Sequence, residues 1–419
     1  MATTPQPTLT SLAKTILQHA ETLEAYLIAN AFPQPSFLPT GPTDFPIPPS
    51  NTALHATRHA LIDATNTLRT LITYPRDLFK WITLTDHTLT AALAVISHFH
   101  LAQSVPLSAP SPSPISPRFI RRAALSHIFI ESPPAHVSHT AASRLLATDP
   151  QLQALVAHMT EEAFPASAKL VDALENCGDG GEPSESPFTL AFGQSFFERK
   201  MAKPETLERF GNAMSAWSAG DGSGFIRDGY AWGELKEGAR VVDVGGAGGH
   251  ISLAVAERFT GLRFVVEDLE GLRGQAEALA AQAGEDVRKR VRFVGCDFFG
   301  EQPEEARGAE VYLLRYILHD WSDGYAVRIL KRVVEAMSKD SRIVIADAVM
   351  PPAGVLAACQ EEVLRSFDVS MLAQLNAQER TLEMWEKLVA DASDGRLGIA
   401  KVIMPEKGES VSILEVRFK

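Results

Sequence analysis

The sequence has few cysteines and no long apolar run, and these two absences exclude several classes of protein. Its three cysteines lie far apart and form no CxxC pair: Cys177, Cys296 and Cys359. A disulfide framework and a thiolate zinc site are therefore excluded, and we expect a reducing, cytoplasmic compartment. No apolar run reaches the roughly 18 residues of a transmembrane helix, and the N-terminal segment lacks the basic start and apolar stretch of a signal peptide.

Positive charge is also scarce. The chain has 39 Lys and Arg residues against 51 Asp and Glu residues, which gives a net charge of −12 at pH 7. This balance argues against a nucleic-acid partner, because binding to phosphates requires a basic surface. The 419 residues are otherwise of ordinary globular composition, with 45% hydrophobic residues. That length exceeds what one core usually holds, so we expect two domains.

The N-terminal part alternates between helical patterns and proline-rich segments. Residues 8–30, 52–73 and 85–100 carry apolar side chains at helical spacing. In contrast, residues 32–50 and 104–117 contain too much proline for a helix or a central strand. We expect these two segments to be irregular.

Residues 118–147 have the element order of a winged helix. RFIRRAALSHIFIES predicts a helix followed by a strand, PPA a turn, HVSHT a second strand and AASRLLA another helix. A winged helix can bind DNA, but its basic residues are few: Arg118, Arg121 and Arg122. We therefore interpret residues 1–160 as a mainly helical, winged-helix-like dimerisation domain, with a non-catalytic regulator as the alternative.

Residues 161–419 form the second expected domain, an α/β domain. Five apolar strand candidates follow one another from residue 240 onward: 240–246, 262–269, 291–299, 311–320 and 342–350. Helical stretches lie between several of them, which predicts a parallel sheet covered on both faces. Two further strands, GRLGIAKVIMP and ESVSILEVRF, flank a short turn and predict a hairpin. A parallel sheet that ends in an antiparallel hairpin is the pattern of a class I methyltransferase, a Rossmann-like fold.

The stretch VVDVGGAGGH (241–250) is the first functional signal. Its glycines permit a tight turn after a strand and a close approach of the backbone to a ligand. The third glycine of a dinucleotide GxGxxG motif is missing. Asp243 lies in the first strand, and Asp268 and Asp297 end the next two. Each acid alone could cap a helix, but three acids around one glycine loop favour S-adenosylmethionine (SAM), a nucleoside cofactor without phosphates.

The stretch LLRYILHDWSD contains the second signal. His319 is one of only two histidines after residue 159, and it follows the fourth strand, at the edge where open α/β sheets bind ligands. Asp320 adjoins it, and further carboxylates follow at Asp347 and Glu379. An isolated histidine could simply close a strand, but this combination indicates a general base.

Together with DVGGAGG, IVIADAVMP and NAQERT, this stretch resembles the caffeate/flavonoid-type O-methyltransferases of plants and fungi over residues 70–419. The resemblance is closest to the fungal branch, which shares VSHTAASRLLA and FGNAMSAWS. It implies a SAM-dependent, metal-independent O-methyltransferase that acts on an aromatic or polyketide-type hydroxyl of a small secondary metabolite. It also implies a homodimer formed through the N-terminal domain.

The resemblance further assigns a role to each site residue. It implies that His319 is the general base, flanked by Asp347 and Glu379. The implied SAM contacts are Gly245, Asp268, Asp297, Phe298 and Arg315, and the implied substrate contacts are Phe210, Met214 and Asp320. Asp347 stands where plant members carry Glu, and Arg315 stands where they carry Lys. Phe210 and Met214 are four residues apart and could equally be core residues on one helix face.

An alternative function keeps the fold and SAM but not methyl transfer. Some fungal relatives of this family use the charge of SAM to steer pericyclic or dehydration chemistry. The intact His319 argues against that alternative. No cluster of His, Cys and Asp has the spacing of metal ligands, so we expect no metal.

Overall fold

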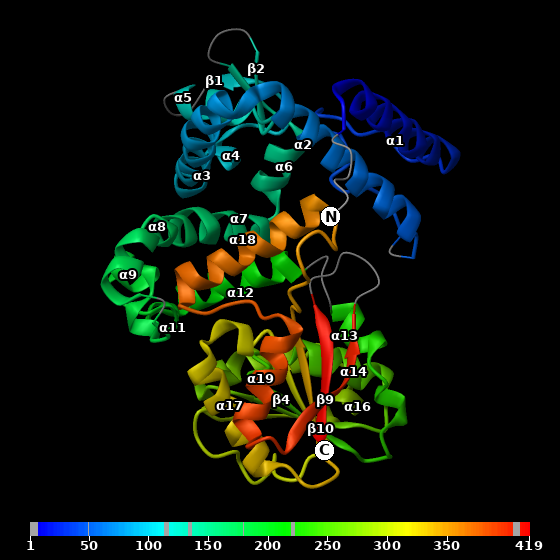
Figure 1. Cartoon of the computed structure of the whole chain (residues 1–419), viewed down its shortest axis with the longest axis vertical. Helices are drawn as coiled ribbons and strands as arrows, with labels where there is room; N and C mark the ends of the chain where they lie inside the picture. Colours follow the sequence, from blue (N-terminus) through cyan, green and yellow to red (C-terminus); the bar gives the residue numbers. More distant parts are fainter. Residues whose placement is uncertain are drawn as a thin grey trace. The chain divides into compact units, whose positions relative to one another are not determined.

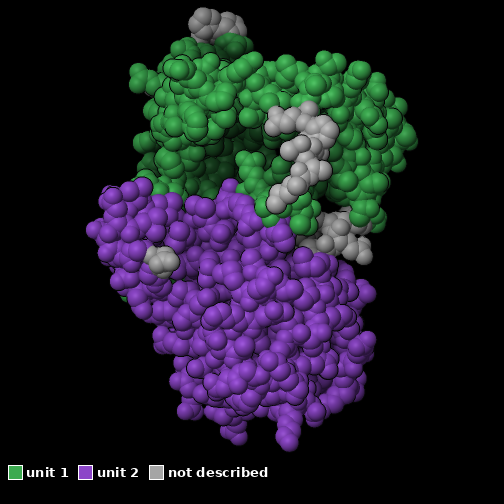
Figure 2. Space-filling model, viewed as in Figure 1, with its two compact units in different colours: residues 1–168, 197–219, 353–363 green, residues 169–196, 220–352, 364–419 purple. Residues whose placement is uncertain are grey.

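The computed structural model describes residues 7–48, 50–112, 117–132, 136–178, 180–218, 223–404 and 411–419. The chain forms two compact units (Figure 2). The first comprises residues 1–168, 197–219 and 353–363, and the second comprises residues 169–196, 220–352 and 364–419. The first unit therefore includes two segments that lie beyond the domain boundary expected at residue 160.

Helices dominate the first unit. They are α1 (Leu9–Ala29), α2 (Thr52–Trp81), α3 (His87–His98), α4 (Leu101–Ser104), α5 (Pro117–Ala124), α6 (Ala141–Thr148), α7 (Pro150–His158), α8 (Phe164–Ser167), most of α11 (Phe196–Met201) and α12 (Pro204–Ser218). Two π-helical turns, η1 (Ile82–Asp86) and η2 (Met159–Ala163), connect some of them. The helices predicted at 8–30, 52–73 and 85–100 are present.

Helix α2 is longer than predicted because it continues through a kink. Tyr74 has φ +60° and ψ +154° inside the helix, directly before Pro75. Proline has no N–H to donate and disfavours helical backbone in the residue before it, which explains where the helix bends.

A small sheet accompanies these helices. Strand β3 (His136–His139) lies between β1 (Ser111–Pro112) and β2 (Phe129–Ser132), and both pairings are antiparallel. The predicted order of helix, strand, strand and helix is thus present in α5, β2, β3 and α6. The predicted PPA turn at 133–135 lies outside the described residues. The interpretation as a winged-helix dimerisation domain stays a prediction.

The second unit contains a seven-stranded sheet, as predicted. Its order is β6 (Val291–Gly295), β5 (Arg263–Asp268), β4 (Arg240–Val244), β7 (Val311–Arg315), β8 (Arg342–Asp347), β10 (Ser412–Phe418) and β9 (Leu397–Ile403). The first five strands are parallel. Strand β10 is antiparallel to both β8 and β9, which confirms the terminal hairpin.

Helices cover both faces of this sheet (Figure 1). Neighbouring residues of one strand enter opposite layers, since Val241 packs with α14 (His250–Arg258) and Val242 packs with α17 (Asp323–Ala336) and α19 (Leu382–Ser393). Burial on both faces explains why the strands read as continuous apolar runs. The remaining helices of the unit are α9 (Leu170–Cys177), α10 (Pro187–Phe192), α13 (Ser223–Gly229), α15 (Arg273–Ala280), α16 (Glu285–Arg290) and α18 (Ala358–Leu375), whose first residues belong to the first unit.

Candidate active site

The glycine turn after β4 is built for close packing of the backbone. Gly245 has φ +72°, which disfavours any residue with a side chain. A Cβ on Gly246 would lie only 2.6 Å from Cγ of Asp243. The N–H groups of Gly245 and Gly246 donate to the main-chain oxygen of Glu267, at 2.8 and 3.1 Å. The turn is therefore fixed to the end of β5, and Gly245 and Gly246 leave no room for a side chain.

Two of the three predicted acids are tied to this turn. Asp243 is buried and accepts a hydrogen bond from the Ser252 hydroxyl at 2.7 Å, while burial raises the pKa of its carboxyl to about 6. Asp268 accepts the N–H groups of Ala247 at 2.8 Å and Leu269 at 2.7 Å, and burial raises its pKa too. These bonds hold Asp268 against the glycine turn, as the sequence predicts.

Asp297 is placed differently, because it is exposed and accepts the N–H of Phe299 at 3.0 Å. Phe298 lies beside the turn, since its ring would be 3.5 Å from a Cβ on Gly245. Arg315 ends β7, and its Nε and Nη2 are buried without a hydrogen-bond partner among the described residues. These nitrogens are free to hold a polar ligand.

The backbone bends sharply between β7 and the predicted base. Tyr316 has φ +51°, an unfavourable conformation for a tyrosine, and its N–H donates to the Ala346 oxygen at 3.1 Å. A 3₁₀ turn, η6 (Leu318–Asp320), follows and carries His319. Strain of this kind often accompanies functional sites, and here it brings the imidazole to the end of the sheet.

The His319 imidazole lies between two carboxylates. It is 5% exposed, its Nδ1 is 2.8 Å from Oε1 of Glu379, and its Nε2 is 3.3 Å from Oδ1 of Asp320. Burial opposes the imidazolium, but the charges of Asp320 and Glu379 outweigh it and raise the pKa of His319 to about 10. The structure thus brings together the predicted base and both of these acids.

Asp347 has a different environment from Glu379. It is fully buried at the end of β8, and neither of its oxygens has a hydrogen-bond partner among the described residues. Burial raises the pKa of Asp347 to about 7, although the charge of His319 acts in the opposite direction. The hydrogen bond that orients the ring therefore comes from Glu379 alone, and a catalytic role of Asp347 stays a prediction.

Sequence reasoning missed two residues around this cluster. Asp368 accepts the backbone N–H of Glu379 at 2.8 Å, and Arg380 is fully buried beneath the histidine turn. Arg380 directly follows Glu379 in the NAQERT stretch, so that adjacency was the available signal.

Phe210 and Met214 lie on α12, in the first unit. Both are half-buried. The Phe210 ring is 5.6 Å from the His158 ring, and Nζ of Lys200 lies 5.2 Å from its centroid. Packing within the first unit therefore accounts for the orientation of Phe210.

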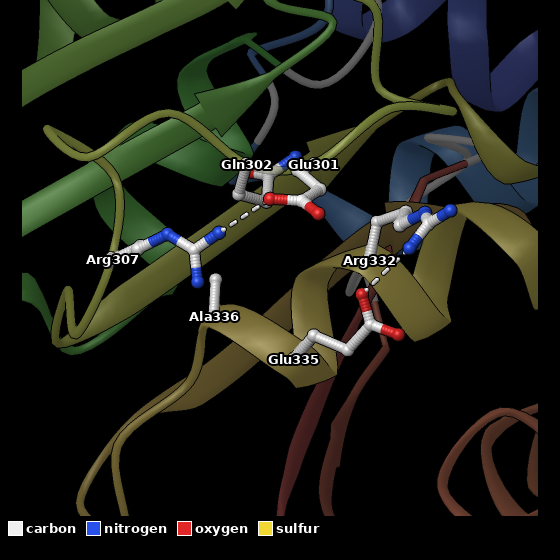
Figure 3. A pocket seen from close by; sticks show the side chains of 6 residues that line it. All are labelled: Glu301, Gln302, Arg307, Arg332, Glu335 and Ala336. Atoms are coloured by element: carbon white, nitrogen blue, oxygen red, sulfur yellow. Dashed lines mark hydrogen bonds and ion pairs between the residues drawn. The ribbon is translucent and has the colours of Figure 1, made fainter.

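A small polar cavity of about 170 Å³ lies elsewhere in the second unit (Figure 3). Its lining residues are Glu301, Gln302, Arg307, Arg332, Glu335 and Ala336. Two ion pairs satisfy its charges, Arg307 with Glu301 and Arg332 with Glu335 (Figure 3). None of the predicted site residues lines it. Across the described residues, no group of His, Cys, Asp and Glu side chains is arranged to hold a metal ion, and no helix is both long and apolar enough to cross a membrane.

Comparison with known proteins identifies the class. The family model described as the O-methyltransferase domain matches residues 168–393. Chlorophenol O-methyltransferase of Trichoderma longibrachiatum is 34% identical over 406 residues, which cover 92% of this chain and 85% of the relative. The O-methyltransferase gsfB of Penicillium aethiopicum is 31% identical, with 97% of each chain covered. The chain therefore belongs to the O-methyltransferase family, and its cofactor is SAM.

Solved structures share the fold. The crystal structure of OxaC superposes with a TM-score of 0.79 at 20% identity and covers 98% of this chain and 99% of that one. The structure of LepI in complex with SAM superposes with a TM-score of 0.71 at 21% identity, with 97% of this chain and 100% of that one covered. At these identities the likeness speaks for the fold alone.

Proposed function

We propose that this O-methyltransferase methylates a hydroxyl of an aromatic or polyketide-type secondary metabolite, with His319 as general base and without a metal. The observation that carries the proposal is the buried imidazole, held at Nδ1 by Glu379 beside the strand ends that carry the glycine turn. The name of the chlorophenol O-methyltransferase, a relative over most of the chain, supports a phenolic acceptor.

The residues at the strand ends suit SAM. The glycine turn lacks side chains, so its backbone can approach a ligand closely, and Arg315 presents buried nitrogens that have no hydrogen-bond partner among the described residues. We propose that the cofactor is held by Gly245, Asp268, Asp297, Phe298 and Arg315. When bound, SAM supplies an electrophilic methyl group and a positive charge.

His319 accepts the proton of the acceptor hydroxyl in this proposal. A phenol with a pKa near ~10 would lose its proton to an ordinary imidazole at a cost of roughly 5 kcal/mol. The carboxylates around His319 raise its pKa to about 10, which makes the transfer itself nearly balanced. Only the unprotonated imidazole can accept the proton, and its share increases as the pH rises toward 10. Glu379 fixes the ring and stabilises the imidazolium as it forms.

We further propose that Asp320, Phe210 and Met214 contact the acceptor, in agreement with the resemblance. The position of Asp320 beside Nε2 of His319 supports its part, because a hydroxyl that donates to Nε2 would lie close to this carboxylate. We also propose that the protein is cytoplasmic, a location that its three unpaired cysteines support.

We propose that the protein is a homodimer that associates through residues 1–150. Large apolar side chains are exposed along the first helices, which supports this surface: Leu9, Leu17, Ile28, Leu71, Ile72, Phe79, Trp81 and Leu84. Sedimentation at micromolar concentration should give twice the chain mass, and a species of 45.5 kDa alone would contradict the proposal.

The test of the proposed function is transfer of label from methyl-labelled SAM to chlorophenols and polyhydroxylated anthraquinones. Label should appear on oxygen together with an equal amount of S-adenosylhomocysteine, and His319→Gln should abolish most of it. Consumption of an acceptor without release of S-adenosylhomocysteine would instead indicate pericyclic or dehydration chemistry. Label transfer that His319→Gln leaves at full rate would contradict the role of the base.

A further inference from the structure

Arg380 makes three hydrogen bonds around the residues that carry the predicted base. Its guanidinium is fully buried and donates from Nη1 to the Leu318 oxygen at 2.7 Å and from Nη2 to the Trp321 oxygen at 2.7 Å. Its Nε donates to Oδ1 of Asp323 at 2.9 Å. The two carbonyls stand immediately before and after the His319–Asp320 pair, so one side chain holds both ends of residues 318–321.

A guanidinium suits these three acceptors. Its planar group donates from three separate nitrogens at once, Nε, Nη1 and Nη2. A lysine ammonium donates from a single point and would leave at least one buried carbonyl without a partner. The Trp385 ring, 5.2 Å from the guanidinium carbon, further fixes the side chain.

The segment that supplies Arg380 is itself anchored. The Arg380 oxygen accepts the Met350 N–H at 2.8 Å, the Glu379 N–H donates to Asp368 at 2.8 Å, and the Gln378 amide donates to Asp323 at 3.0 Å. Glu379 and Arg380 therefore act on the same turn from a rigid support. Glu379 holds the imidazole at Nδ1, and Arg380 holds the backbone from which that imidazole projects.

We propose that Arg380 is a positioning residue for methyl transfer, which sets the place of the His319 imidazole by binding the carbonyls of Leu318 and Trp321. This inference rests on the proposed role of His319 as general base. The hydrogen bonds of Arg380 go to two main-chain carbonyls and to Asp323, so its effect passes through the backbone of residues 318–321. Loss of the guanidinium lets this turn shift, and small displacements of a catalytic group slow a reaction strongly.

The test compares Arg380→Lys and Arg380→Gln with a matched control. Arg342→Gln removes a half-buried arginine at the first residue of β8, where it bonds Tyr230 and Glu415. Single-turnover methyl transfer to a chlorophenol and the calorimetric dissociation constant for SAM are measured for each variant. We expect both Arg380 variants to lower the rate by about 10–100-fold, with SAM affinity unchanged. We expect Arg342→Gln to keep the rate even if it melts at a lower temperature.

A second measurement does not depend on turnover. The proton between Nδ1 of His319 and Glu379 should give a downfield proton NMR signal, assigned by its loss in His319→Gln. The signal should persist in Arg342→Gln and broaden by fast exchange in both Arg380 variants. A wild-type protein that transfers no methyl group would overturn the proposed function, while the NMR signal would still test Arg380.

The Arg380 proposal alone fails if wild-type methyl transfer is observed and Arg380→Lys retains the full rate and a sharp signal. The single ammonium group of a lysine would then hold residues 318–321 as well as the guanidinium does. If Arg380→Gln does not fold, Arg380→Lys decides, because it keeps the charge and most of the length of the side chain.

Discussion

A buried ion pair in the first unit offers a sharp test of the energetics. Lys200 of α11 and Glu162 of η2 are each 1% exposed and form an ion pair. Glu162 also bonds Nδ1 of His158 at 2.8 Å and Nη2 of Arg209 at 3.2 Å. Burial favours the neutral acid, but His158 and Lys200 together lower the pKa of Glu162 to about 2. Burial lowers the pKa of Lys200, and Glu162 counteracts this.

Removal of one partner leaves a buried charge uncompensated. We expect Lys200→Met to cost about 3 kcal/mol, because His158 and Arg209 still bind Glu162. We expect Glu162→Gln to cost about 4–5 kcal/mol, because the buried ammonium of Lys200 then loses the carboxylate that it pairs with. The double variant should cost about 1–2 kcal/mol, less than either single change, since both charges leave together. Lys80→Met, which breaks an exposed pair with Asp77, is the control and should cost at most about 0.5 kcal/mol.

The assay is native-state hydrogen exchange of peptides from residues 150–165 and 197–218, which reports on the first unit by itself. A loss of about 3 kcal/mol of stability increases the rate of exchange through opening of the unit by roughly 100-fold. Because the folded pKa of Glu162 is depressed from 4.5 to about 2, its stabilisation is present above pH 4.5 and is lost as the pH falls toward 2. Glu162→Gln should remove that acid dependence. Single and double variants whose costs simply add would refute the reasoning.

Three further predictions concern the second unit. His319→Gln should lower kcat by about 10²–10⁴ with little change in SAM affinity. Because the pKa of His319 is raised from 6.5 to about 10, the rate of the wild-type enzyme should increase with pH above 6.5. A rate that is already independent of pH above pH 6 would contradict this. Asp268→Ala should weaken calorimetric SAM binding by about 1.5–3 kcal/mol, because the cofactor ribose loses a charged acceptor, and unchanged affinity would remove Asp268 from the site. Gly246→Ala should lower stability by about 1–3 kcal/mol and weaken SAM binding, because the new Cβ meets Asp243. Gly248→Ala is the control, because no neighbour lies closer than 3.5 Å, and it should change neither the melting temperature nor the increase in melting temperature that SAM causes.

The second unit could be predicted well from the sequence, because its strands are long apolar runs and its acids stand at their ends. The order of elements from Arg240 to the final hairpin follows from those signals alone. The contacts of Arg380 could not be predicted, since its partners are main-chain carbonyls about 60 residues earlier. Every residue has a main-chain carbonyl, so the sequence does not indicate which ones bind an arginine. The role of Asp347 as an acid that flanks His319 stays a prediction. Of the two predicted flanking acids, Glu379 makes the hydrogen bond to the ring, and a sequence does not show which side chain reaches it.

The composition of the first unit was missed for a related reason. Residues 197–219 belong with the N-terminal helices because α12 packs on α7 and Lys200 reaches Glu162. A helix face that packs on a distant helix looks the same in sequence as one that packs on its neighbour. The boundary expected at residue 160 therefore describes the change in sequence pattern but not the two compact units.

This interleaving has a consequence for how the protein is made. The first unit needs residues 353–363, so it cannot be completed when residue 168 leaves the ribosome. At the usual 5–20 residues per second, the missing segment arrives about 10–40 s later. During that interval the surfaces of the early helices that pack against residues 353–363 are exposed in the nascent chain. The protein should therefore depend on chaperones during synthesis more than a chain whose domains follow one another. Two fragments divided at residue 160 should each aggregate when expressed alone and should be soluble only when co-expressed.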